Sequence, residues 1–331
     1  MKERFWLEVI APSSESALDH RYLEGRRVFN TKLLPCITVI VPTFNRAASV
    51  QRLLASLDAL EFSDSLPTTE VIMVDNGSTD GTEGILSENG TRQHPFDFVF
   101  LRETARGKSN ALNSGIGVAR GDLLIFADDD VVADRHWLIK HWECHRDSDF
   151  GAVQGRVLPG LDPQGRPANQ SHLREYNIPI VDYGDRIRSI RNFTGANVSL
   201  KREVIKQVGL FNPRLGPGAL GFSEDTEYSM RIRNAGFSIG YAPDAVVFHE
   251  LRPERYGRTY HRRVEYKRGM GRSLYRQDSI CFKVLPALLA HCIRYGIYRV
   301  LGNAQKAYKS EGRIWKWWGY LNGKLGSSRL I

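Results

Sequence analysis

The stretch GDLLIFADDDVVAD, residues 121–134, runs from a block of apolar residues into three consecutive aspartates, Asp128, Asp129 and Asp130. The apolar block predicts a buried β-strand over 122–127. Three adjacent carboxylates repel one another, so they cost stability unless water, hydrogen bonds or a cation neutralises them. We therefore expect this strand to end in a binding site.

The chain before this stretch alternates β-branched runs with helix-like patterns. Helices are predicted in ASVQRLLASLDAL (48–60), from the turn GSTDG onward, and in SNALNSGIGVAR (109–120), with Gly121 as a C-cap. This alternation is typical of β-α-β units. It predicts an α/β fold with a mostly parallel sheet flanked by helices. The predicted strands before the aspartates are 37–42, 70–75 and 97–102.

Three polar clusters follow predicted strands. PTFNR (42–46) follows the first, DNGSTDG (75–81) the second and ADDD (127–130) the fourth. Because the carboxyl ends of parallel strands lie along one edge, where open α/β sheets bind ligands, the clusters should converge on one site.

The second half of the chain is less regular. GAVQGRVLPG (151–160) predicts a strand, whereas 160–193 lacks periodicity and suggests a functional or mobile connection that helps to choose the acceptor of a reaction. GANVSLKREVIKQVGLF (195–211) predicts a strand and a short helix. The stretch 222–250 predicts a helix, a cap at Gly236 and a strand, and the chain is helical from 258 onward.

Composition excludes several classes of protein. With 42% hydrophobic and 25% charged residues, the chain should be an ordinary folded, soluble protein. The first residues do not form a secretory signal, and no run of some 18 to 20 apolar residues predicts a transmembrane helix, so we expect a cytoplasmic protein. The four cysteines are scattered and should be free thiols.

The positive charge is concentrated in the tail. From Leu251 to the end there are 18 Lys and Arg against 4 Asp and Glu, whereas residues 1–250 hold 28 against 33. Together with Trp and Tyr residues, this composition is typical of a surface that rests on an anionic membrane. An ordinary helical extension with solvated cations is the alternative. Nucleic-acid binding would suit the charge, but no motif supports it.

Seven motifs, in order, resemble the inverting glycosyltransferases of family 2, which have the GT-A fold. They are VIVPTFNR, VDNGSTDGT, RGKSNALNSGI, FADDDV, GANVSLKREVIKQVGLF, SEDTEYSMRI and VVFHE, and they extend from about Ile37 to His249. The resemblance implies a GT-A domain over 36–250, with an N-terminal extension over 1–35 and a basic helical region over 251–331.

The resemblance assigns a nucleotide site to the first two loops. It places Pro42, Thr43, Asn45, Arg46 and Asp75 around the base and ribose, and a carboxylate suits these because it accepts two hydrogen bonds. The alternative is that Asp75 only initiates a turn. Lys108 at a helix start could meet a phosphate, with Arg106 as a second candidate, or could be solvated.

The triple aspartate resembles the D-x-D element of the family. That resemblance makes Asp130 a metal ligand, Asp128 a ligand of metal or ribose, and Asp129 part of the donor site. Oxygen ligands suit Mg²⁺ or Mn²⁺. The family often adds a late histidine, here His249, which would favour Mn²⁺; a structural histidine is the alternative.

The E-D element of the family corresponds to Glu224 and Asp225, with Asp225 as the general base. The family usually has Gly where this chain has Ser223, which could equally act as an N-cap with acidic residues in the first helical turn. Asn197 corresponds to the segment that lines the sugar pocket and could bond a sugar hydroxyl, or could be part of a buried strand.

These resemblances imply transfer of a sugar, with inversion, from a nucleotide sugar, a UDP-sugar by preference, to a saccharide or lipid-linked acceptor in cell-surface polysaccharide synthesis. Two other hypotheses remain: a nucleotidyltransferase, and a non-catalytic nucleotide-sugar binding protein. Nucleotidyltransferases usually have a Gly-rich basic loop after the first strand, and the stretch PTFNRAAS at this position is not such a loop.

Overall fold

The computed structural model describes residues 36–63, 66–160, 180–252, 255 and 257–327. The predicted extension over 1–35 and most of the 160–193 connection lie outside these residues. The elements are β1 (Cys36–Thr43), α1 (Ala47–Asp58), β2 (Thr68–Asp75), α2 (Thr82–Asn89), β3 (Asp97–Arg102), α3 (Lys108–Val118), β4 (Leu123–Ala127), β5 (Val131–Ala133), α4 (Trp137–Arg146), β6 (Ala152–Pro159), β7 (Arg188–Ile190), β8 (Asn197–Lys201), α6 (Arg202–Val208), α7 (Glu224–Asn234), β9 (Ile239–His249), α8 (Arg258–Tyr275), η3 (Ile280–Val284), α9 (Leu285–Val300) and α10 (Ala304–Ser327).

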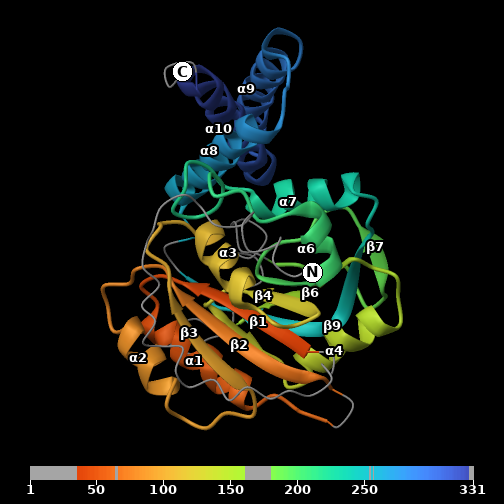
Figure 1. The fold of residues 1–331 in the computed structure, drawn as a ribbon. Helices are drawn as coiled ribbons and strands as arrows, with labels where there is room; N and C mark the ends of the chain where they lie inside the picture. The colour runs from red at the N-terminus through yellow and green to blue at the C-terminus, as the bar shows by residue number, and fades with distance from the viewer. Residues whose placement is uncertain (1–35, 64–65, 161–179, 253–254, 256, 328–331) are drawn as a thin grey trace, which may run out of the picture. The chain divides into compact units, whose positions relative to one another are not determined.

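One sheet organises the described chain, in the strand order β3-β2-β1-β4-β8-β6-β9-β5, with β7 also paired to β9 (Figure 1). The first four strands of this order are parallel, as predicted. Beyond β4 the sheet is mixed, because β8 runs antiparallel to both β4 and β6 while β6 and β9 are parallel. The α/β class is confirmed, and the parallel part of the sheet is the half that carries the three polar clusters.

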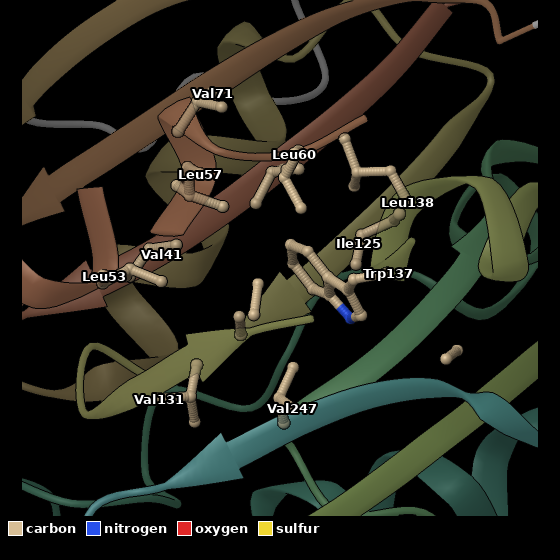
Figure 2. Packing of buried hydrophobic residues seen from close by; sticks show 14 of the residues in the cluster. Val41, Leu53, Leu57, Leu60, Val71, Ile125, Val131, Trp137, Leu138 and Val247 are labelled. Carbon is tan, nitrogen blue, oxygen red and sulfur yellow. The ribbon is translucent and has the colours of Figure 1, made fainter. Parts of the chain in front are cut away.

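Alternate residues of β4 enter two separate cores. Ile125 belongs to the cluster on one face of the sheet and Phe126 to the cluster on the other. Because β4 is buried on both faces, it reads as a continuous apolar run. Figure 2 shows the first cluster, which holds Leu53 and Leu57 of α1, Ile125 of β4 and Trp137 of α4. Helices α3, α6 and α7 supply the second cluster.

One predicted cap is wrong. Helix α3 ends at Val118 and is followed by Ala119 in an extended conformation, not by a glycine cap. Gly121 instead lies against β1, where a Cβ atom would come 2.5 Å from the backbone nitrogen of Thr38. Its place is therefore fixed by close packing between two strands. The predicted cap at Gly236 is confirmed, since its φ is +89°.

The C-terminal region is helical, as predicted, but one of its helices is more apolar than expected. Over Ile280–Val300, η3 and α9 form 21 residues that contain an 18-residue window of mean hydropathy 1.4, long and apolar enough by length and composition to cross a membrane. The segment is a candidate by length and composition alone, and it is not the unbroken apolar run whose absence led to the expectation of no transmembrane helix. A search for an unbroken apolar run does not find this segment, because Lys283, Arg294 and Arg299 interrupt its apolar residues.

Candidate active site

A cavity of about 460 Å³ opens where β1 and β4 end. Eight of the predicted site residues line it, and they come from the end of β1 and the loop after it, from the loop after β4 and from the start of α3. The lining residues are Pro42, Thr43, Phe44, Arg46, Asn76, Arg106, Gly107, Lys108, Asp128, Asp129, Asp130, Pro217, Gly218, Phe222, Arg255 and Tyr260. The convergence predicted from strand order is therefore present.

The middle aspartate is held by the first loop. Thr43 Oγ1 donates a 2.7 Å hydrogen bond to Asp129 Oδ2, and Arg46 Nε lies 3.9 Å from Asp129 Oδ1. Burial, with the charge of Asp130 next to it, raises the pKa of Asp129 to about 7, although Thr43 and Arg46 oppose this shift. Asp129 therefore serves mainly to connect the end of β1 to the end of β4, and less to contact a ligand.

Asp128 is paired with a lysine from the neighbouring helix. Lys108 begins α3 and its Nζ donates to Asp128 Oδ1. Burial disfavours both charges, but each stabilises the other, so the pKa of Lys108 is raised and that of Asp128 is lowered. The same Nζ lies 3.8 Å from Glu224 Oε1, so Lys108 links the β4 aspartates to α7.

Asp130 faces His249 because of strand pairing. Strand β5 begins at Val131 and pairs with His249, the last residue of β9, so Asp130 and His249 are brought side by side. His249 Nε2 lies 3.2 Å from Asp130 Oδ1, and both side chains are buried. Ligand atoms of Asp128, Asp130 and His249 lie within 4.8 Å of one another.

The hydrogen bonding of His249 fits a metal ligand. Its Nδ1 lies 2.9 Å from the Glu250 carbonyl oxygen, to which it can only donate. In the neutral ring this leaves Nε2 as an acceptor that faces a carboxylate oxygen, an arrangement that a bound cation relieves. Two carboxylates and one imidazole are a donor set suited to a divalent metal such as Mn²⁺.

The acidic pair lies at the start of α7. Glu224 is buried and Asp225 is half-buried, and neither lines the cavity, although Phe222 just before them does. Burial and the charge of Asp225 raise the pKa of Glu224 to about 7, against the influence of Lys108. Burial likewise raises the pKa of Asp225. Ser223 has a φ of +84°, a conformation that a glycine would adopt without strain.

Two of the residues predicted to contact the nucleotide make local hydrogen bonds. Asp75 is fully buried, and both its oxygens accept the backbone N–H of Ser78 at 3.2 Å, as the turn hypothesis requires. Asn45 Oδ1 accepts the backbone N–H of Thr79 at 2.7 Å. These bonds brace the two loops that form one wall of the cavity.

Asn197 is occupied within the core and does not face a sugar. Its side chain is fully buried; Oδ1 accepts 2.8 Å bonds from Trp137 and His141, and Nδ2 donates to the carbonyls of Arg156 and Ala245. No donor or acceptor is left for a hydroxyl group. The buried-strand alternative describes it better.

Sequence reasoning missed several lining residues. Asn76 accepts the backbone N–H of Gly107 at 2.7 Å and donates to two carbonyls, which fixes the loop before Lys108. The ring of Phe44, which was not predicted, has its centroid 4.2 Å from the guanidinium of Arg106, which was a predicted candidate. Arg255 and Tyr260 come from beyond the family motifs. Only the density of Arg in 251–263 could have signalled them.

Comparison with known proteins identifies the family. The family described as "Glycosyl transferase family 2" matches residues 38–209, just over half of the chain. The chain is 26% identical over 223 residues to the glycosyltransferase AglE of Haloferax volcanii, covering 67% of this chain and 69% of that protein. It is 28% identical over 258 residues to the poly-beta-1,6-N-acetyl-D-glucosamine synthase of Staphylococcus epidermidis, covering 76% of this chain but only 56% of the synthase.

Solved structures support the fold. The mannosyltransferase PcManGT from Pyrobaculum calidifontis, in complex with GDP-Man and Mn²⁺, superposes with a TM-score of 0.54 at 18% identity, covering 89% of this chain and 75% of that one. GalNAc-T7 with UDP, GalNAc and Mn²⁺ gives a TM-score of 0.53 at 16% identity, covering 76% and 53%. The predicted GT-A fold is thereby confirmed.

Proposed function

Because the chain belongs to glycosyl transferase family 2, we propose that it transfers a sugar, with inversion, from a UDP-sugar to a hydroxyl group of a saccharide or lipid-linked saccharide. The observation that carries this proposal is the cavity at the ends of β1 and β4, where the three aspartates lie beside Lys108 and the acidic pair of α7 follows. The domain division at 36–250 and 251–331 is part of the proposal.

Asp130, Asp128 and His249 would hold the metal, Mn²⁺ or Mg²⁺. Their ligand atoms are close enough to share one ion. When bound, the metal would neutralise the donor diphosphate and help it to leave. Lys108, fixed beside Asp128 at the first turn of α3, would place a cation on the same diphosphate.

Thr43, Arg46 and Pro42 would contact the nucleotide, while Asn45 and Asp75 shape the loops around it. We propose uridine from the family resemblance alone, because the two structural neighbours were solved with different nucleotides, GDP-Man and UDP.

Asp225 would act as the base. Its hydrogen bonds from Thr226 both go to Oδ1, at 2.6 Å and 3.2 Å, so Oδ2 is the oxygen placed to accept a proton. The acceptor O–H bond breaks with its proton going to Asp225, the acceptor oxygen forms the bond to the anomeric carbon, and the diphosphate oxygen leaves with the electron pair. Glu224, at 3.8 Å from Lys108, would hold that lysine between donor and base.

The test is release of nucleoside diphosphate from a panel of UDP-, GDP- and other nucleotide sugars with Mn²⁺, with and without a lipid extract that supplies the acceptor. Wild type is compared with Asp130→Ala, Asp225→Asn and a control, Asp147→Asn, whose carboxylate is exposed and paired with Arg146. We expect metal-dependent release that both site variants abolish and the control keeps. Donor binding without turnover above the Asp225→Asn level would favour the binding-protein hypothesis, and pyrophosphate release from nucleoside triphosphates would favour the nucleotidyltransferase.

We further propose that the 251–331 region contacts an anionic membrane through α9. One stripe along η3 and α9 is exposed although apolar: Phe282, Leu285, Leu289, Ile293, Ile297 and Val300 are 46% to 90% exposed. Their spacing of three or four residues puts them on one face. The opposite side packs near Tyr320 and Leu321 of α10. Because the surrounding region carries an excess of Lys and Arg, a lipid surface with negative headgroups is the partner that suits both features.

This contact is tested by cosedimentation with phosphatidylglycerol and phosphatidylcholine vesicles. The double variant Leu289→Asn, Ile293→Asn should lose binding to anionic vesicles, whereas Leu210→Asn, which changes an exposed leucine outside the region, should retain it. Equal binding of all three proteins would contradict the proposal.

A further inference from the structure

Asp130 is paired with an arginine that the family motifs do not include. Arg255 lies between the end of β9 and the start of α8, lines the cavity, and its Nη2 lies 2.9 Å from Asp130 Oδ2. The Asp130 side chain is only 4% exposed and that of Arg255 is 19% exposed. A buried carboxylate requires a partner, and Arg255 provides a charged one.

The same carboxylate belongs to the cluster that could hold a metal. Its other oxygen faces His249, and Asp128 completes the group. A divalent ion bound by Asp130 would lie within a few ångströms of the Arg255 guanidinium, where two positive charges repel strongly. The metal and Arg255 therefore compete for one carboxylate.

We propose that Arg255 is a displaceable counter-cation: it neutralises Asp130 until metal and donor bind, and then passes to the donor diphosphate. This rests on the proposed function. Metal binding removes the partner of Arg255, and the diphosphate beside the metal supplies a new one that a guanidinium can bind through two hydrogen bonds. The exchange leaves every buried charge paired both before the ligands bind and when metal and donor are bound together.

The neighbouring arginine cannot make the same move. Arg252 also approaches Asp130, with Nε 3.3 Å from Oδ2, but its Nη2 donates to Ser49 at 3.0 Å and to Glu250 at 3.1 Å. These bonds tie Arg252 to α1 and to the residue after β9. Arg255 is thus the cation at this carboxylate that also reaches the cavity.

This exchange makes the binding of metal and nucleotide cooperative. Metal alone must displace Arg255, which weakens its binding, whereas metal with a diphosphate leaves Arg255 with a partner. Coupling between two ligands typically amounts to about 5-fold to 150-fold in affinity. Removing the guanidinium should therefore change the two affinities in opposite directions, which a purely structural role would not do.

The test compares wild type, Arg255→Gln, Arg255→Lys and the control Arg146→Gln, which removes an exposed arginine paired with Asp147. The affinity for Mn²⁺ alone is measured from the electron paramagnetic resonance signal of the free ion. The affinities for uridine and guanosine diphosphate are then measured by calorimetry at saturating Mn²⁺. Neither readout needs turnover.

We expect Arg255→Gln to bind Mn²⁺ at least about fivefold more tightly and the diphosphate at least about fivefold more weakly than wild type. Arg255→Lys should be intermediate and Arg146→Gln unchanged. Unchanged Mn²⁺ affinity in Arg255→Gln would overturn the competition, and unchanged diphosphate affinity would overturn the transfer to the donor. If wild type and Asp130→Ala both fail to bind Mn²⁺, the metal site of the proposed function fails instead, and this proposal with it.

Discussion

Thr43, the last residue of β1, donates a 2.7 Å hydrogen bond to Asp129, the middle residue of the acidic triplet after β4. Both groups are buried, so the bond joins two strand ends beneath the candidate active site. A buried carboxylate oxygen that loses its donor costs about 1–3 kcal/mol, or more because it can be charged.

Thr43→Val should therefore lower the free energy of unfolding by at least about 1 kcal/mol, while Thr43→Ser, which keeps the hydroxyl, should lose less. Urea unfolding at neutral pH measures both variants. Equal stability of the two would show that the hydroxyl does not support Asp129.

The acidic pair predicts how activity depends on pH. The pKa of Glu224 is raised to about 7 and that of Asp225 is raised too, so the pair retains a proton at higher pH than ordinary carboxyl groups. Because the base must be unprotonated, kcat/KM should fall toward acidic pH, with the acidic limb above the pH range in which ordinary carboxyl groups titrate. In Glu224→Gln the neighbouring charge is gone, so the acidic limb should move to lower pH.

The measurement is the pH profile of nucleoside diphosphate release for wild type, Glu224→Gln and the exposed control Asp147→Asn, which should follow wild type. An acidic limb that stays in place in Glu224→Gln would contradict the coupling of the two carboxylates.

Two histidines buried behind the site predict a loss of stability in mild acid. Burial lowers the pKa of His141 to about 4 and of His145 to about 3. Both therefore stay neutral when folded, whereas the unfolded chain binds protons below about 6.5. The free energy of unfolding should fall as pH drops from about 6.5 to about 4, by ~1.4 kcal/mol per pH unit for each histidine.

Urea unfolding between pH 8 and pH 5 tests this. His145→Gln removes one of the two groups, so its stability relative to wild type should improve as pH falls. His136→Gln, at a side chain that is 45% exposed, should run parallel to wild type. Parallel curves for His145→Gln as well would contradict the prediction.

A contact between two glycines joins the C-terminal helices to the loop before the acidic pair. A Cβ atom on Gly271 of α8 would lie 1.8 Å from the Phe222 carbonyl oxygen, and one on Gly221 would lie 2.3 Å from the Gly271 nitrogen. Gly271→Ala should therefore destabilise the protein by several kcal/mol and lower activity through displacement of Glu224 and Asp225. Gly296→Ala in α9, where nothing lies within 4 Å, should be neutral or slightly stabilising. Thermal unfolding and the turnover assay together check this pair.

The sequence predicted those features that a local pattern determines. The apolar run of β4 indicated a strand, and its end indicated where the three aspartates would lie, because strand direction fixes which edge of the sheet they reach. The chain order of the motifs predicted the fold for the same reason.

Features that depend on long-range packing escaped prediction. The sequence around Asn197 is the same whether its side chain faces a sugar or the core. Its environment is determined by the approach of Trp137 and His141 from another part of the chain. From the sequence, Gly121 resembled a helix cap, because the sequence does not indicate that β1 packs beside it. The proximity of Arg255 to Asp130 follows from the end of β9, which no local pattern contains.

The pairing of Val131 with His249 has a consequence for the order of folding. The aspartates follow β4, which pairs with β1 within the first part of the chain. His249 reaches the aspartates only when β9 joins the sheet, after a long intervening segment. Closing such a large loop is slow compared with forming local structure. The full affinity for a divalent ion would therefore develop late in folding. A metal-binding signal followed during refolding would report when the second half of the sheet has joined the first.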